Sequence, residues 1–139
     1  MKVLVDTSIW SLALRRGKQG SKTDQSNLRE ELAELIREGR AQLIGPIRQE
    51  LLAGIREEAQ HISLRDHLRA FPDESLATMD FEQAASVSNR CRAAGIAGSA
   101  IDFLICAVAM ERGWEIFTTD RDFYRYARAA PVRLYKPRG

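Results

Sequence analysis

Apolar residues gather in several short runs along the chain, each bounded by polar or glycine-containing stretches. The first run, in "KVLVD", is rich in β-branched residues and predicts a buried strand over residues 2–6. Further runs predict strands at "QLIG" (42–45), at 75–78 within "FPDESLATM", at "EIFTTD" (115–120) and at "VRLYK" (132–136). The segment around 75–78 fits either a short strand or a loop.

Between these runs the apolar residues recur at three- and four-residue spacing, which predicts amphipathic helices. One such stripe consists of Leu28, Leu32, Leu35 and Ile36, and Gly39 then favours a helix end. The predicted helices span residues 8–16, 28–38, 46–53, 58–70, 80–94, 99–112 and 121–130, with residues 17–27 as a loop.

The alternation of strands and helices is typical of an α/β protein. We therefore expect a mainly parallel central sheet of four to five short strands flanked by helices. The chain has 139 residues, no internal repeat and no linker-like stretch, so it predicts a single domain over residues 1–139.

Composition is that of an ordinary globular protein, with 45% hydrophobic residues, 29% charged residues and a net charge of +2. No segment has the length and apolar character of a signal peptide or a membrane span, and two cysteines do not make a disulfide framework. We therefore expect a soluble cytoplasmic protein with no membrane contact. Basic residues nevertheless cluster near the C-terminus and in the polar loop, where Arg15, Arg16 and Lys18 are candidates for phosphate contact.

The segment "IDFLICAVAM" (101–110) places a single carboxylate, Asp102, in a helix that is apolar on every side. Such a helix is buried, and an isolated buried carboxylate is strongly unfavourable unless it is paired, hydrogen-bonded or bound to metal. Asp102 therefore needs a partner. The first turn of its own helix is one possibility, because free N–H groups there favour a carboxylate. A site shared with other acids is the second.

Two further aspartates follow predicted strands: Asp6 comes after "VLV" and Asp120 after "EIFTT". Ligands of open parallel sheets bind at the carboxyl ends of the strands, which is where both aspartates are expected. Either could instead cap the helix that follows it. A fourth acid, Glu50 in "GPIRQELLAG", lies close to the apolar stripe of its helix, although its spacing favours an ordinary surface position.

Carboxylates that converge repel each other, and they tolerate closeness only by sharing protons or by binding a cation. The only histidines, His61 and His67, lie on a helix dense in surface charge and do not form a zinc ligand set. Ligands made only of oxygen suit a hard ion such as Mg²⁺ or Mn²⁺. Because such ions act on phosphate groups, the acids predict hydrolysis of a phosphodiester.

The motifs "DTS" at Asp6, "AIDFLICAVA" around Asp102 and "FTTDRDF" (117–123), with the isolated Glu50 between them, resemble PIN-domain ribonucleases. The resemblance is closest to the toxin subunits of bacterial VapBC toxin–antitoxin pairs and covers essentially the whole chain. It implies a Mg²⁺- or Mn²⁺-dependent endoribonuclease toxin that hydrolyses RNA with Mg-activated water. It also implies a homodimer and a cognate protein antitoxin that blocks the active-site groove.

Residue by residue, the resemblance implies an acidic quartet with catalytic and metal-binding roles, made of Asp6, Glu50, Asp102 and Asp120. Asp122 is a further candidate ligand, with Asp120 expected to lie nearer the metal. Ser8 and Thr118 match supporting polar positions of the family. Arg15, Arg16 and Lys18 are the candidates for the RNA path, through phosphate contacts and not through base recognition.

Other interpretations of the strand-end acids fit less well. A phosphatase of the haloacid-dehalogenase type needs a second Asp two residues after the first, and that position is Ser8. A receiver domain needs paired acids early in the chain, and Asp6 has no acidic neighbour. Two alternatives within the resemblance stay open, namely a PIN nuclease of RNA maturation and an inactive PIN-like binding module.

Overall fold

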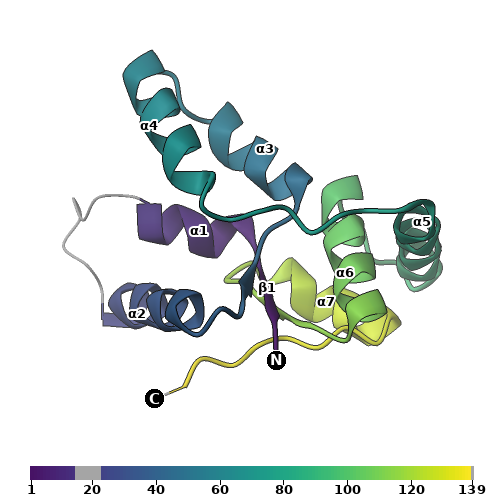
Figure 1. The fold of residues 1–139 in the computed structure, drawn as a ribbon. Helices are drawn as coiled ribbons and strands as arrows, with labels where there is room; N and C mark the ends of the chain where they lie inside the picture. The colour runs from purple at the N-terminus through teal and green to yellow at the C-terminus, as the bar shows by residue number, and fades with distance from the viewer. Residues whose placement is uncertain (15–22, 139) are drawn as a thin grey trace.

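The computed structural model describes residues 1–14 and 23–138, and within them a parallel sheet lies at the centre (Figure 1). Its strands are β1 (Val3–Val5), β2 (Ala41–Gln42) and β3 (Glu115–Phe117), in the order β2-β1-β3. Both pairings are parallel, and every residue of β1 is buried. This confirms the predicted α/β class and the parallel sheet.

The sheet of the described residues has three strands, fewer than the four to five expected. The strand predicted at 75–78 is absent, and the nearest pairing is a single parallel bridge between Leu43 and Asp73. The Ser75 carbonyl, which a strand would use in the ladder, accepts a hydrogen bond from the Arg112 guanidinium at 2.9 Å. The strand predicted at 132–136 is likewise reduced to one parallel bridge, between Ile116 and Leu134. Prolines at 131 and 137 bracket that segment and remove two backbone donors.

Helices connect the strands at nearly all the predicted places. They are α1 (Thr7–Leu14), α2 (Thr23–Arg37), α3 (Gly45–Ala53), α4 (Glu58–Leu68), α5 (Thr78–Ala93), α6 (Ala100–Arg112) and α7 (Asp122–Ala129). The loop predicted over residues 17–27 was too long at its C-terminal end, because α2 already begins at Thr23. The first turn of α2 lacks apolar residues, so the periodicity did not reveal it. Arg15, Arg16 and Lys18 lie outside the described residues.

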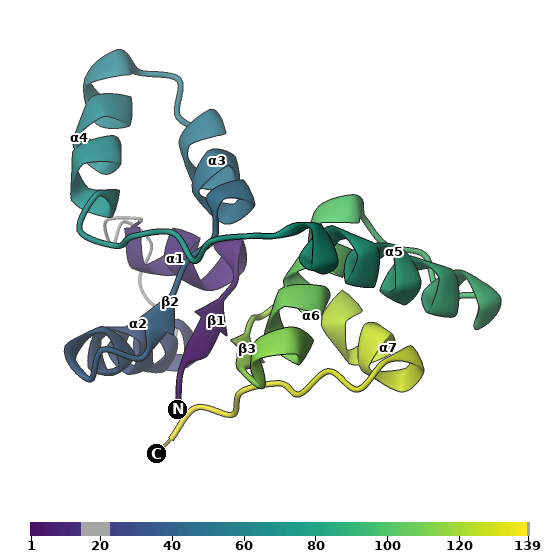
Figure 2. The ribbon, with the colours of Figure 1, turned by 45° about the vertical axis from the view of Figure 1, so that its right-hand side comes forward.

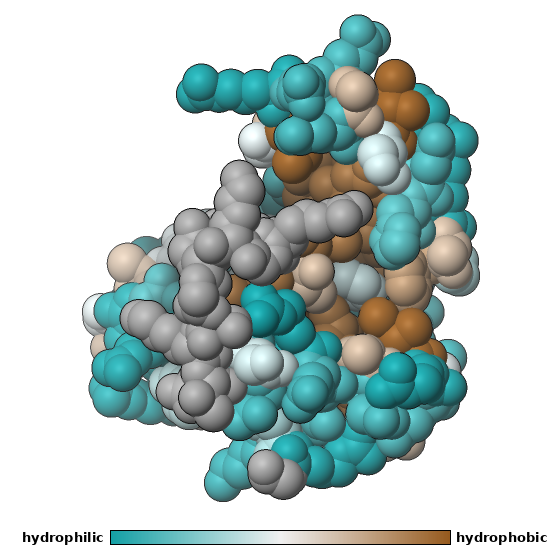
Figure 3. All heavy atoms as spheres, turned by 90° about the vertical axis from the view of Figure 1, so that its left-hand side faces the viewer, coloured by the Kyte–Doolittle hydropathy of each residue, from teal (hydrophilic) through white to brown (hydrophobic). Residues whose placement is uncertain are grey.

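The helices form groups around the sheet. In two views, α1 and α2 lie to one side, α5, α6 and α7 to the other, and α3 and α4 form a hairpin that projects beyond the sheet (Figures 1 and 2). Below this hairpin the surface is hollowed, and hydrophobic atoms are exposed in the hollow (Figure 3). The surrounding helices carry leucines that the core covers only in part, namely Leu28, Leu52 and Leu64.

Helix α6 forms the centre of the larger helical group. All residues from Phe103 to Ala109 are buried, as the apolar sequence predicted. The helix ends at Gly113, whose φ of 69° lies in the left-handed region that favours glycine. None of the helices in the described part of the chain has the length and hydropathy needed to cross a membrane.

Candidate active site

Asp6 stands at the carboxyl end of β1 and is only 6% exposed. Its backbone N–H donates to the carbonyl of Phe117, the last residue of β3, at 2.9 Å, so the ends of the two strands meet here. Its carboxylate Oδ2 accepts hydrogen bonds from the hydroxyl of Ser8 at 3.0 Å and from that of Thr118 at 2.7 Å. Two neutral donors therefore fix the Asp6 carboxylate at the sheet edge.

The same two hydroxyls also position the loop after β3. The N–H of Thr119 donates to Ser8 Oγ at 3.0 Å, and the N–H of Asp120 donates to Thr118 Oγ1 at 2.9 Å. Asp120 Oδ1 in turn accepts the N–H of Asp122, at the start of α7, at 2.9 Å. These hydrogen bonds hold residues 118–122 in a defined turn. The hydroxyls that bind Asp6 therefore also position Asp120 and, through it, Asp122.

Asp102 reaches the site from the first turn of α6. Its backbone N–H donates to the Oγ of Ser99, the N-cap residue, at 3.1 Å, and its carboxylate accepts the hydroxyl of Tyr126 at 2.7 Å. Burial raises the pKa of Asp102, and the nearby charges of Asp6 and Asp120 raise it further, against the effect of the Tyr126 and Ser99 hydrogen bonds. Its side chain is only partly buried, although the seven residues that follow it in the helix are all buried.

Tyr126 can reach Asp102 because residue 98 is a glycine, which has no side chain to block the tyrosine ring. A Cβ added to Gly98 would lie 2.7 Å from both the Tyr126 ring and the Phe103 ring, closer than real side chains approach. The Tyr126 and Phe103 rings also pack edge to face, with centroids 5.4 Å apart. Burial raises the pKa of Tyr126, and the bond to Asp102 raises it further, so the hydroxyl remains a proton donor at neutral pH.

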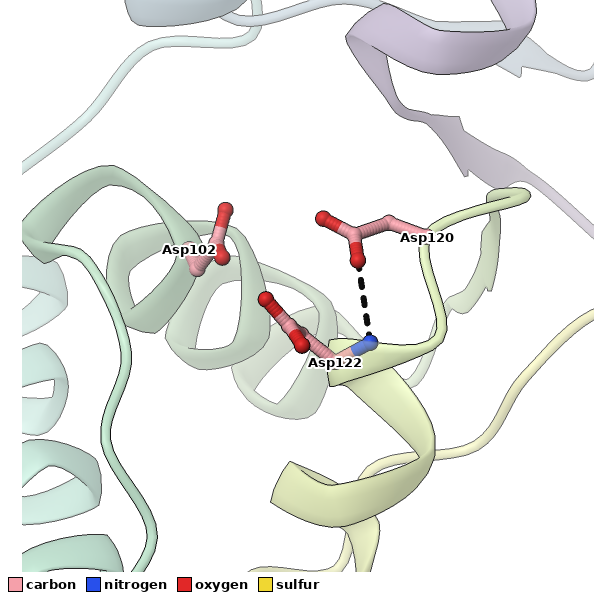
Figure 4. Close-up of side chains that lie close together, drawn as sticks. All are labelled: Asp102, Asp120 and Asp122. Carbon is pink, nitrogen blue, oxygen red and sulfur yellow. Dashed lines mark hydrogen bonds between the residues drawn. The ribbon is translucent and has the colours of Figure 1, made fainter.

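The carboxylates of Asp102, Asp120 and Asp122 converge on one space (Figure 4), with one oxygen from each lying within 4.8 Å of the others. They come from α6, from the loop after β3 and from the start of α7. Like charges so placed repel unless a cation or a shared proton lies between them. All the ligand atoms are hard carboxylate oxygens from three segments of the chain, so the set fits Mg²⁺ or Mn²⁺.

Glu50 lies at the edge of this arrangement. Its Oε1 accepts the hydroxyl of Thr7 at 2.6 Å, which ties α3 to the residue next to Asp6. Its side chain is exposed, and it is not part of the three-carboxylate group. The structure thus ties Glu50 to Thr7, the residue after Asp6, and leaves it outside the group of Asp102, Asp120 and Asp122.

Asp120 and Asp122 differ in their neighbours. Asp122 forms an ion pair with Arg125 one turn along α7, whereas no cation of the described residues pairs with Asp120. Both belong to the convergent group. The charge left uncompensated at Asp120 favours it as the closer ligand, and that assignment stays a prediction.

Two residues of the site were missed in the sequence. Tyr126 anchors Asp102, and Thr7 anchors Glu50. A tyrosine on the apolar face of a helix carries a hydroxyl that needs a partner when buried, so Tyr126 gave a usable signal. Thr7 gave none, because a threonine after a strand-end aspartate is also an ordinary helix start.

Comparison with protein-family models gives a match to the PIN domain over residues 3–129. The chain belongs to the PIN domain family, whose α/β fold agrees with the parallel sheet and flanking helices described above. A comparison with curated protein sequences found no match.

Solved structures with the same fold include chains of FitAcB and of several VapBC proteins. A chain of FitAcB from Neisseria gonorrhoeae is 20% identical, with a TM-score of 0.76 over 97% of each chain. A chain of VapBC2 from Rickettsia felis, bound to a DNA fragment from their promoter, is 16% identical, with a TM-score of 0.73 over 97% of this chain and 98% of that one. VapBC-1 from nontypeable Haemophilus influenzae is 14% identical, with a TM-score of 0.72 over 98% of each. At these identities the likeness shows the fold.

Proposed function

We propose that the chain is a metal-dependent endoribonuclease and the toxin of a toxin–antitoxin pair, neutralised by a cognate protein antitoxin. The observation that carries the nuclease part is the convergence of Asp102, Asp120 and Asp122 beside the buried Asp6. Of these carboxylates only Asp122 pairs with an arginine of the described residues, and acids left uncompensated so close together are costly to fold; a cation-dependent function explains their presence.

Each residue of the site has a definite task in this proposal. Asp102, Asp120 and Asp122 would hold the ion, with Asp6 beside them and Glu50 at the edge. Ser8 and Thr118 orient Asp6, and Tyr126 orients Asp102. A bound Mg²⁺ or Mn²⁺ would stabilise charge on the phosphate and lower the pKa of the attacking water. The rigid support from α6 and from the sheet edge keeps the carboxylates in place, and such preorganisation is the protein's main contribution to the rate.

RNA cleavage is tested with purified protein and a labelled single-stranded RNA. Cleavage should require Mg²⁺ or Mn²⁺, stop with EDTA, and be lost in Asp120→Asn. A second measurement does not depend on activity: Mn²⁺ should raise the melting temperature of the parent and leave that of Asp120→Asn unchanged. The matched control is Glu82→Gln, which alters an exposed acid of α5. If Asp120→Asn cleaved and bound Mn²⁺ like the parent, the proposed site would be wrong.

The toxin assignment is supported by the likeness to chains of FitAcB and VapBC complexes. It is also supported by the apolar hollow below the α3–α4 hairpin, because exposed hydrophobic surface is typical of a site that a protein partner covers (Figure 3). Expression of the chain alone in a bacterium should arrest growth, and Asp120→Asn should relieve the arrest. A PIN nuclease of RNA maturation would cleave RNA without stopping growth.

The homodimer is part of the same proposal. One chain has a mass of 15.7 kDa, so light scattering after gel filtration should give about twice that value. A mass that stays at one chain across the accessible concentration range would contradict it.

A further inference from the structure

Helix α7 has two contrasting faces. Phe123 and Tyr126 point into the core and are buried. The opposite face carries Arg121, Tyr124, Arg125 and Arg128, all exposed and spaced so that they form one stripe. The helix is thus attached through one aromatic face and presents a second, basic face with an aromatic ring in its middle.

These four residues line an open groove of about 450 Å³. Tyr124 is 63% exposed, which leaves a large ring in water without packing partners. Among the described residues, Arg125 pairs with Asp122, whereas no carboxylate pairs with Arg121 or Arg128. The groove therefore offers an accessible aromatic face and uncompensated positive charge.

The groove begins where the carboxylate cluster ends. Arg121 lies between Asp120 and Asp122 in the chain, and the Asp122–Arg125 ion pair joins the two regions. Arg121 and Arg128 are separated by about 10 Å along the helix axis. A polymer bound at the cluster would enter the groove as it continues along α7.

We propose that this groove binds the single-stranded RNA segment next to the bond that is cut. Tyr124 stacks on a base, and the flanking arginines contact phosphates. This inference rests on the proposed nuclease function and adds the path of the substrate. It differs from the path expected from Arg15, Arg16 and Lys18, which lie outside the described residues.

Charge complementarity favours RNA over a protein partner. Interleaved arginines and an exposed aromatic ring are the elements by which single strands are bound without sequence preference. The acids of the cluster can bind a phosphate only through a cation. The arginines can contact the adjacent phosphates of the same strand directly. Arginine and tyrosine are also frequent in protein interfaces, so an acidic peptide is included as a competing probe.

Stacking is tested by the binding of a fluorescent twelve-nucleotide RNA, measured by anisotropy in EDTA so that no cleavage occurs. Tyr124→Ala should raise the Kd about five- to 150-fold, and Tyr124→Phe, which keeps the ring, should bind like the parent. Phe81→Ala is the matched control, because Phe81 is 54% exposed and lies on α5. An RNA with abasic sites throughout should bind parent and Tyr124→Ala equally.

The phosphate contact is tested through the salt dependence of the same Kd. Arg128→Gln should weaken binding and reduce the slope of log Kd against log salt by about 0.7, the value for one phosphate of a single strand. Arg56→Gln, which removes an exposed arginine from the α3–α4 turn, should leave the slope unchanged.

The outcomes distinguish a failure of the groove proposal from a failure of the nuclease proposal. If the parent cleaves RNA with Mn²⁺ but the Tyr124 and Arg128 variants bind and cleave like it, the groove is wrong and the nuclease stands. If the parent neither binds nor cleaves RNA, both fail. If a twelve-residue acidic peptide binds and depends on Tyr124 while RNA does not, the groove is a protein site and the inference is overturned.

Discussion

Asp6, Glu31 and Asp80 are equally buried acids, yet their surroundings differ in kind. Glu31 and Asp80 each meet an arginine. Within residues 1–14 and 23–138, the side-chain donors to the Asp6 carboxylate are only the neutral hydroxyls of Ser8 and Thr118. A buried carboxylate is ordinarily paired with a positively charged side chain. The exception at Asp6 indicates that the positive charge at this site would come from a bound cation and not from the protein.

The compensated case is clearest at Asp80. Arg112, at the end of α6, donates to both Asp80 oxygens, at 2.6 and 3.0 Å, and to Glu74 at 2.6 Å. The Ala77 N–H adds a third bond to Asp80, at 2.8 Å. Hydrogen bonds from Arg112 lower the pKa of Asp80 despite its burial. This cluster fastens α5 and the chain before it to α6.

Glu31 repeats the pattern on the other side of the sheet. Burial alone would raise its pKa, but hydrogen bonds from Arg138 and Tyr135 hold it below the usual value. Arg138 also reaches Glu38 at 3.0 Å, so the C-terminal segment is fastened to α2. Acids paired in this way hold the fold together, whereas burial and the nearby charges of Asp6 and Asp120 raise the pKa of Asp102, whose carboxylate accepts a neutral hydroxyl from Tyr126.

The comparison predicts the largest loss of stability for Arg112→Met. It leaves Asp80 buried without its charge partner, which costs about 3 kcal/mol in the free energy of unfolding. Urea denaturation measures the change. The matched control is Arg37→Met, because the Arg37–Glu34 pair is 65% and 51% exposed and such pairs contribute about 0.5 kcal/mol or less. Equal losses of stability in the two variants would contradict the difference between the buried and the exposed ion pair.

Thr118→Val should cost less, about 1–2 kcal/mol, because it removes a neutral donor to Asp6 and the acceptor of the Asp120 N–H. The same variant should weaken Mn²⁺ binding, since Asp6 and Asp120 lose their common support. Thr119→Val changes an exposed neighbour and should alter neither quantity. Calorimetric titration with Mn²⁺ and urea denaturation provide the two readouts, and an unchanged Mn²⁺ affinity in Thr118→Val would contradict the role given to this hydroxyl.

A smaller effect concerns acid pH. Because the folded pKa of Asp80 lies below its ordinary value of 3.8, the unfolded state takes up its proton first as pH falls. The stability that the carboxylate contributes is present above that value and is lost as pH falls through the lowered pKa. Between pH 6 and pH 3, Asp80→Asn should therefore lose less stability than the parent in urea denaturation, whatever its starting value. A parallel decline of both proteins would refute this.

Much of this arrangement was predictable from the sequence, because it follows from the local pattern of apolar and polar residues. The apolar run of α6 revealed both its burial and the anomaly of Asp102, and the strand ends placed Asp6 and Asp120 at one edge of the sheet. The sequence left open whether the Asp102 carboxylate uses its own first turn or a shared site. In the structure the carboxylate accepts the Tyr126 hydroxyl and faces Asp120 and Asp122, while Ser99 caps the Asp102 backbone N–H.

What could not be predicted depends on contacts between distant segments. Arg112 lies in the last turn of a helix, where a basic residue is ordinary, and nothing near it in the chain indicates that it reaches Ser75 and Asp80. That contact is what turns the predicted strand at 75–78 into an irregular connection. The pairing of Glu31 with Arg138 spans the chain in the same way.

The smallest change in stability is expected at the site itself. Asp102→Asn keeps the shape of the side chain and an acceptor for Tyr126, but it removes a charge that is partly desolvated and repelled by Asp6 and Asp120. In EDTA at pH 7 the variant should be as stable as the parent or more stable by about 1 kcal/mol, whereas RNA cleavage should fall at least about a hundredfold.

The control for Asp102→Asn is Asp80→Asn, the same exchange at an acid that an arginine compensates. It should destabilise the protein, because Arg112 loses a charged partner in a buried position. Urea denaturation of both variants, with and without Mn²⁺, completes the test. Mn²⁺ should stabilise the parent and Asp80→Asn but not Asp102→Asn. If Asp102→Asn proved the less stable of the two without metal, Asp102 would hold the fold as Asp80 does, and the strain at the site would be no sign of a missing cation.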